Sequence, residues 1–109
     1  MLHYACEWKD LQDRIKMRVM IGKFPILLAS VQGRPYAVID KCPHMGFSIS
    51  NGKFDSGIIQ CKEHGLQINV TNGQVVDTPK ANFLKISPLD RLIRTFECVI
   101  ENEKVYIEM

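Results

Sequence analysis

The sequence predicts an all-β protein, a sandwich or barrel of antiparallel strands with a small metal-binding subdomain. Short β-rich apolar runs recur along its 109 residues and are separated by Gly, Pro, Asn and Asp. No stretch shows the period of a long amphipathic helix. A chain of this length suits a single domain with one modest core. We therefore expect one domain over residues 1–109, with its metal-binding part at about residues 40–80.

The first half of the chain predicts four strands and two turns. Trp8 to Gln12 suits a turn or a single helical turn, and the spacing from Trp8 to Leu11 lets both cover one end of the core. Gln32 to Pro35 is a turn that joins the third and fourth strands as a hairpin. The expected strands are residues 2–6, 15–21, 26–31 and 36–39.

The second half predicts a long loop and further hairpins. Residues 48–57 are rich in Asn, Gly and Ser and are expected to be loop. Asn72-Gly73 favours a tight turn, after which Val75 and Val76 return. Val105 and Ile107 alternate with polar residues and mark a buried face. Residues 77–80 suit a turn, and residues 81–91 are left unassigned. The expected strands are residues 58–60, 66–70, 92–100 and 104–108.

Composition limits the possible partners. A net charge of +2 is too small to suggest nucleic acid, and no apolar run approaches the ~20 residues that span a bilayer. The N-terminus carries Glu7, Lys9 and Asp10 in place of the apolar run of a secretory signal. We therefore expect a soluble, cytoplasmic monomer with reduced cysteines. His3 suits a surface or edge position, Trp8 the core, and Cys6 and Cys98 suit buried positions.

Two motifs combine cysteine with histidine: residues 42–46 read Cys-Pro-His-Met-Gly, and residues 61–65 read Cys-Lys-Glu-His-Gly. Thiolate and imidazole together can hold zinc or the two unlike irons of a mixed-ligand cluster. Common zinc fingers place both cysteines in one knuckle and both histidines on a helix. Here each motif has its cysteine first and its histidine second. That order favours two thiolates on one iron and two imidazoles on the other.

These motifs resemble the Rieske ferredoxin family. The resemblance implies one [2Fe–2S] cluster, with Cys42 and Cys61 on the inner iron and His44 and His64 on the outer iron. It extends to the flanking hairpins, and the Thr78-Pro79 turn resembles a family loop that covers the cluster. Family members of bc-type complexes carry an extra cysteine pair, but Phe47 and Glu63 stand here, so that disulfide is not expected.

The resemblance also implies a reduction potential. High-potential members have a serine and a tyrosine where this chain has Leu66 and Ile68. With fewer hydrogen bonds to the cluster sulfurs, the potential is expected near the low end of the Rieske range, about −150 mV. If the histidine rings face water, the potential should fall at alkaline pH. This pattern resembles the soluble ferredoxins that supply oxygenases.

The expected function is that of an electron carrier, not an enzyme, which takes one electron from a ferredoxin reductase to a terminal oxygenase. Alternatives are a small subunit of a larger oxidoreductase, such as nitrite reductase, and a structural zinc domain. Three apolar residues beside the ligands would either form a docking rim or merely shield the cluster or fill core: Met45, Phe47 and Leu66. Charged neighbours would orient a partner: Lys41, Lys62 and Glu63.

Overall fold

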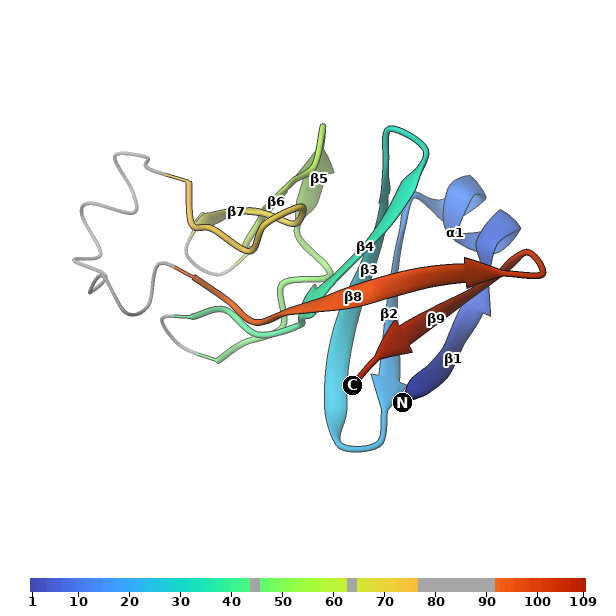
Figure 1. Ribbon diagram of the computed structural model, residues 1–109. Helices are drawn as coiled ribbons and strands as arrows, with labels where there is room; N and C mark the ends of the chain where they lie inside the picture. Colours follow the sequence, from blue (N-terminus) through green and yellow to red (C-terminus); the bar gives the residue numbers. More distant parts are fainter. Residues whose placement is uncertain (44–45, 63–64, 77–91) are drawn as a thin grey trace.

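The computed structural model describes residues 1–43, 46–62, 65–76 and 92–109. It contains two antiparallel sheets, as the sequence predicts (Figure 1). The larger sheet has six strands in the order β1-β9-β8-β4-β3-β2, and the smaller has three in the order β5-β6-β7. The strands are β1 (Leu2–Glu7), β2 (Lys16–Ile21), β3 (Phe24–Val31), β4 (Arg34–Ile39), β5 (Lys53–Asp55), β6 (Ile58–Gln60), β7 (Gln67–Asn69), β8 (Thr95–Glu101) and β9 (Lys104–Glu108).

Strand β3 separates two hydrophobic cores. Because side chains of a strand alternate between its faces, the apolar run at residues 26–29 is buried on both sides. Ile26 and Leu28 belong to one core, and Leu27 and Ala29 to the other. The first, the barrel core, lies within the curled larger sheet and includes Leu11, Phe96, Val105 and Ile107. The second, the site core, joins the larger sheet to the smaller one and includes Val38, Ile49, Ile59 and Ile68.

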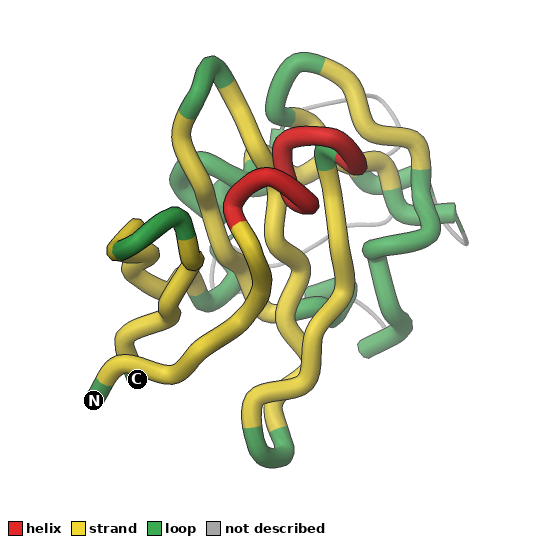
Figure 2. The backbone as a smooth tube through the Cα atoms, turned by 90° about the vertical axis from the view of Figure 1, so that its right-hand side faces the viewer, coloured by secondary structure: helices red, strands yellow, loops and turns green. Residues whose placement is uncertain are grey.

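A two-turn helix, α1 (Trp8–Arg14), closes one part of the barrel core. Figure 2 shows it in red beside the strands, and it contacts β1, β2 and β3. The helix is longer than the single turn that the sequence predicts. Asp10 in its first turn and Arg14 in its last turn suit the helix dipole, which favours its extension. Leu11 is fully buried and Trp8 packs against the same core, as expected.

The prediction that residues 48–57 form only loop is wrong, because β5 lies within them. Lys53, Phe54 and Asp55 pair with Gln60, Ile59 and Ile58 of β6. The half-buried Phe54 packs against the site core. Three residues are too few to show a period of two in the sequence, so the pairing with β6 determines this strand.

Other elements follow the predictions with shifted boundaries. β3 begins at Phe24 and contains Pro25, earlier than expected, and β8 begins at Thr95, later than expected. Residues 75 and 76 return beside β7 without a strand of their own, through the isolated bridge of Ile68 with Val75. The buried face of the last strand is confirmed, since Val105 and Ile107 are fully buried. The predicted turn at 77–80 and the unassigned segment 81–91 lie outside the described residues.

Several single-residue predictions are confirmed. His3 lies on β1, at the edge of the larger sheet. Cys6 is buried as predicted, whereas Cys98 is only half-buried and packs against the same barrel core. In the part of the chain that the structure describes, no helix is long and apolar enough to cross a bilayer.

Candidate metal centre

The two cysteines of the motifs begin loops with the same hydrogen bonding. The backbone N–H of Cys42 donates to the carbonyl of Phe47 at 2.6 Å, and that of Cys61 donates to the carbonyl of Leu66 at 2.7 Å. In return, the N–H of the glycine four residues on donates to the cysteine carbonyl, at 2.7 Å for Gly46 and 2.8 Å for Gly65. Each loop thus closes on its own cysteine, and the two sequence motifs form two matching turns.

The backbone conformation explains why glycine ends each motif. Gly46 has φ of +76° and Gly65 has φ of +68°. This left-handed region is readily adopted by glycine and strained for residues with a Cβ. The positive φ turns the chain back, so that the N–H can reach the cysteine carbonyl.

Both cysteines are buried in the same place. Cys42 and Cys61 are each 1% exposed, and both belong to the site core. Asp40 and Lys41 separate Cys42 from the end of β4, and Cys61 follows β6 directly, so the larger and the smaller sheet contribute one cysteine each. The β5–β6 hairpin lies between them in the sequence, and the fold brings both into the site core.

The predicted histidine ligands, His44 and His64, lie outside the described residues. The same is true of Met45 and Glu63. Over residues 1–43, 46–62, 65–76 and 92–109, no group of three or more His, Cys, Asp or Glu side chains lies together as a metal site. The described part of the site therefore consists of the two cysteine turns and their surroundings.

Asp40 fastens the first cysteine loop, a role that the sequence did not predict. Its Oδ1 accepts the N–H groups of Ile49 and Ser50, both at 2.8 Å. Its Oδ2 accepts the Ser48 hydroxyl at 2.7 Å and forms an ion pair with Arg18 Nε at 2.6 Å. The carboxylate thereby ties the start of the loop to its end. An isolated acidic residue between an apolar strand and a cysteine is the only sequence signal.

The charge state of Asp40 follows from two opposing effects. Burial raises the pKa of its carboxyl, but hydrogen bonds from Ser48, Arg18 and the backbone of Ile49 outweigh burial. The net result is a pKa below the usual value, so Asp40 is anionic at neutral pH. Its fully buried charge is compensated by Arg18, whose side chain is 47% exposed.

Leu66 does not belong to a docking rim. It is fully buried in the site core, as is Ile68, so the alternative that it shields the cluster or fills core holds for Leu66. Phe47, by contrast, is 49% exposed. The apolar Leu66 and Ile68 side chains carry no hydrogen-bond donor, and they lie in the same core as the two cysteines.

The donor set fits an iron–sulfur centre. Two cysteines are buried in one apolar core, and matched turns hold the backbone that carries them. Soft thiolates are the ligands that iron–sulfur clusters take in proteins, and a dry surrounding limits access of water to the sulfurs. The residues present can therefore hold one such group between the larger and the smaller sheet.

Comparison with known proteins agrees with this geometry. A family model described as the Rieske [2Fe-2S] domain matches residues 1–96. Apoptosis-inducing factor 3 of Homo sapiens is 33% identical over 103 residues, which cover 94% of this chain and 16% of that protein. The ferredoxin component of biphenyl 2,3-dioxygenase from Rhodococcus jostii is 26% identical over 104 residues, which cover 95% of this chain and 89% of that protein.

A solved structure shows the same fold. The complex of reduced oxygenase and oxidized ferredoxin in carbazole 1,9a-dioxygenase contains a chain that matches with a TM-score of 0.79 and 28% identity, covering 97% of this chain and 91% of that one. By contrast, this chain spans only about a sixth of the length of apoptosis-inducing factor 3. With its two cysteine turns and the match over most of its length, the chain belongs to the Rieske [2Fe–2S] domain family.

Proposed function

We propose that this chain is a one-electron carrier whose cluster is held by Cys42, Cys61, His44 and His64. The observation that carries the proposal is the burial of the two cysteines in one core, at the head of two matching turns. Family membership supplies the cofactor, one Rieske [2Fe–2S] cluster. In that assignment Cys42 and Cys61 bind the inner iron, and His44 and His64 bind the outer iron.

The bound cluster would take up and release a single electron. The chain's own residues would fix the ligands and exclude water. Leu66 and Ile68 remove donors from the neighbourhood of the sulfurs, which supports a potential near the low end of the Rieske range, about −150 mV. No bond of a substrate is made or broken in this role, so we assign the chain no catalytic residue.

A terminal oxygenase is the proposed acceptor and a ferredoxin reductase the proposed donor. Support comes from the relative named as the ferredoxin component of biphenyl 2,3-dioxygenase, whose length this chain nearly matches. The matching carbazole dioxygenase ferredoxin is seen with its oxygenase. The single domain over residues 1–109, with its cluster-binding part at about residues 40–80, belongs to this proposal. A monomeric state and a cytoplasmic location stay predictions.

A second candidate is a domain or subunit of a larger oxidoreductase. The oxygenase component of dicamba O-demethylase from Stenotrophomonas maltophilia is 27% identical over 99 residues, which cover 91% of this chain and 28% of that longer protein. Rieske domains of this size therefore also occur inside larger oxidoreductases. Both candidates use the same cluster and the same four ligands.

The test uses matched cysteine variants of the iron-loaded protein. We expect a red-brown protein that gives an EPR signal on reduction. Cys42→Ser removes an assigned ligand and should abolish the signal. Cys98→Ser, at a half-buried position of the barrel core, should keep it. A colourless protein with one zinc per chain, or equal loss of signal in both variants, would overturn the proposal.

A further inference from the structure

Charge is distributed unevenly along this chain. Residues 1–15 and 95–109 carry seven acidic and three basic side chains, whereas residues 16–94 carry five acidic and eleven basic ones. The first group forms β1, α1, β8 and β9, of which β1, α1 and β9 lie away from the smaller sheet (Figure 1). The basic residues of this middle segment include residues of β2, β4 and β5 as well as of the cysteine loops, so the charge at the loops depends on the lysines that lie next to them.

Three lysines lie next to the two cysteines. Lys41 precedes Cys42, Lys62 follows Cys61, and Lys53 of β5 pairs with Gln60, the residue before Cys61. All three side chains are exposed. Within the described residues, no ion pair engages any of them. Their charges are thus available to another molecule.

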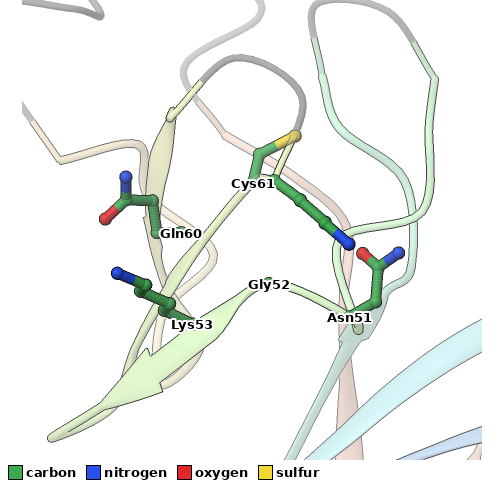
Figure 3. A pocket seen from close by; sticks show the side chains of 6 residues that line it. Asn51, Gly52, Lys53, Gln60 and Cys61 are labelled. Carbon is green, nitrogen blue, oxygen red and sulfur yellow. The ribbon is translucent and has the colours of Figure 1, made fainter.

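Two of these lysines share a pocket. Lys53 and Lys62 line a hollow of about 260 Å³ together with Asn51, Gln60 and Cys61. Figure 3 shows the side chains of Asn51, Lys53, Gln60 and Cys61 around it. The amide groups of Asn51 and Gln60 add hydrogen-bond donors to the two ammonium groups. Such a lining suits a carboxylate.

We propose that the electron-transfer partner presents an acidic face to this end of the molecule and places an Asp or Glu carboxylate in the Lys53–Lys62 pocket. The inference rests on the proposed function and adds the chemistry of the partner's surface. Complementary charge speeds the encounter of two redox proteins and orients the short-lived complex. The acidic β8–β9 end would at the same time repel an acidic partner from the wrong side.

The first test measures oxidation of the reduced protein by small cobalt complexes of opposite charge. Each reaction moves one electron from the cluster to Co(III), which becomes Co(II). When salt is raised from about 10 mM to about 300 mM, oxidation by anionic Co(EDTA)⁻ should slow, because salt screens its attraction to the lysines. Oxidation by cationic hexaamminecobalt should accelerate, because salt screens its repulsion. The opposite salt dependence, or none, would contradict a basic cluster face.

Lysine variants test whether the pocket causes the effect of charge on the oxidation rate. The double substitution Lys53→Gln and Lys62→Gln should slow oxidation by Co(EDTA)⁻ about threefold at low salt. The matched control is Lys23→Gln, an exposed lysine of the β2–β3 turn, which should leave the rate unchanged. The EPR spectrum reports whether each variant retains its cluster. Equal effects of the double variant and of Lys23→Gln would refute the assignment of the pocket.

The second test needs no electron transfer. Fluorescently labelled poly-L-glutamate should bind the parent protein at low salt, bind the double variant at least threefold more weakly, and bind Lys23→Gln as it binds the parent. Monomeric glutamate at the same carboxylate concentration should not compete, if a protein surface is the occupant. Binding by the parent without any electron transfer would contradict the proposed function alone. Electron transfer with unchanged polyglutamate binding in the double variant would contradict the docking site alone.

Discussion

At the scale of single residues, Asp40 contributes most to the shape of the candidate site. Among the described residues it is the one buried charged side chain, and it contacts Arg18, Ser48, Ile49 and Ser50. A buried carboxylate is stable only when it is paired and fully hydrogen-bonded. All four contacts lie on the loop that Cys42 begins or on neighbouring β2. Loop geometry around Cys42 therefore depends on this carboxylate.

Replacement of Asp40 should destabilise the protein. Asp40→Asn keeps the shape but turns one acceptor into a donor, which then faces N–H or guanidinium donors, at a cost of about 1–3 kcal/mol. The free energy of unfolding in urea measures this. The matched control is Asp55→Asn, because Asp55 is exposed and its carboxylate accepts a long hydrogen bond of 3.2 Å from the Ser56 hydroxyl. This variant should change the free energy of unfolding by less than about 0.5 kcal/mol. Equal stability of the two variants would contradict the role given to Asp40.

Tyr4 should show an unusual titration. Its hydroxyl donates to Glu7 Oε2 at 2.6 Å, and this hydrogen bond, followed by desolvation and the charge of Glu7, raises the pKa of Tyr4 to about 12. The phenol keeps its proton because the phenolate would face a carboxylate. Glu7→Gln should therefore lower the pKa of Tyr4 toward 10.0, its ordinary value. Difference absorbance of phenolate against the parent measures this shift, and the exposed Glu101→Gln should not reproduce it.

At the scale of elements, the smaller sheet depends on close approach of two backbones. A Cβ on Gly52 would lie 1.8 Å from the carbonyl oxygen of Gln60. Gln60 pairs with Lys53 and precedes Cys61. Glycine at position 52 thus allows β5 to pair at the end of β6 from which the second cysteine loop starts.

Gly52→Ala tests this contact. Because backbone atoms would have to move, we expect a loss of about 2–3 kcal/mol in unfolding free energy and a lower iron content. Gly22→Ala is the control: Gly22 has φ of +59° but open space around it, so the cost is the conformational one alone, about 1 kcal/mol. Urea unfolding and iron analysis compare the two variants. If Gly22→Ala loses as much iron as Gly52→Ala, the close approach is not the reason.

At the scale of the whole molecule, β3 contributes side chains to two separate cores. Its neighbouring leucines are both fully buried but face opposite sides, Leu27 in the site core and Leu28 in the barrel core. The site core holds both cysteines, whereas the barrel core holds α1 and the strands around it. Overall stability therefore depends on both cores, and the surroundings of the metal centre on one.

The two leucines make a matched pair of variants. Leu27→Ala and Leu28→Ala should each lower the unfolding free energy by about 2–5 kcal/mol, because each leaves a cavity in a packed core. Only Leu27→Ala should broaden or shift the EPR and visible circular dichroism spectra of the cluster. Urea unfolding and the two spectra separate the effects. A cluster spectrum changed equally by Leu28→Ala would show that the cores are not independent.

Much of the architecture is predictable because its signals are local. The alternation of Val105 and Ile107, the turn at Asn72-Gly73 and the run at residues 26–29 each reflect the period of a strand or the conformational freedom of a turn residue. The order of cysteine and histidine within each motif likewise points to one kind of centre. Those features can be recognised within a few residues, so a single sequence contains them.

The sequence by itself determined the all-β class, the two cysteine motifs and the family. Only the tertiary structure decided that β5 exists, that Leu66 is buried, that Asp40 ties its loop together and that Lys53 and Lys62 line one pocket. The physical reason is that each of these depends on a partner distant in the chain or across a sheet. Such pairings form through long-range packing, which a local sequence pattern does not predict.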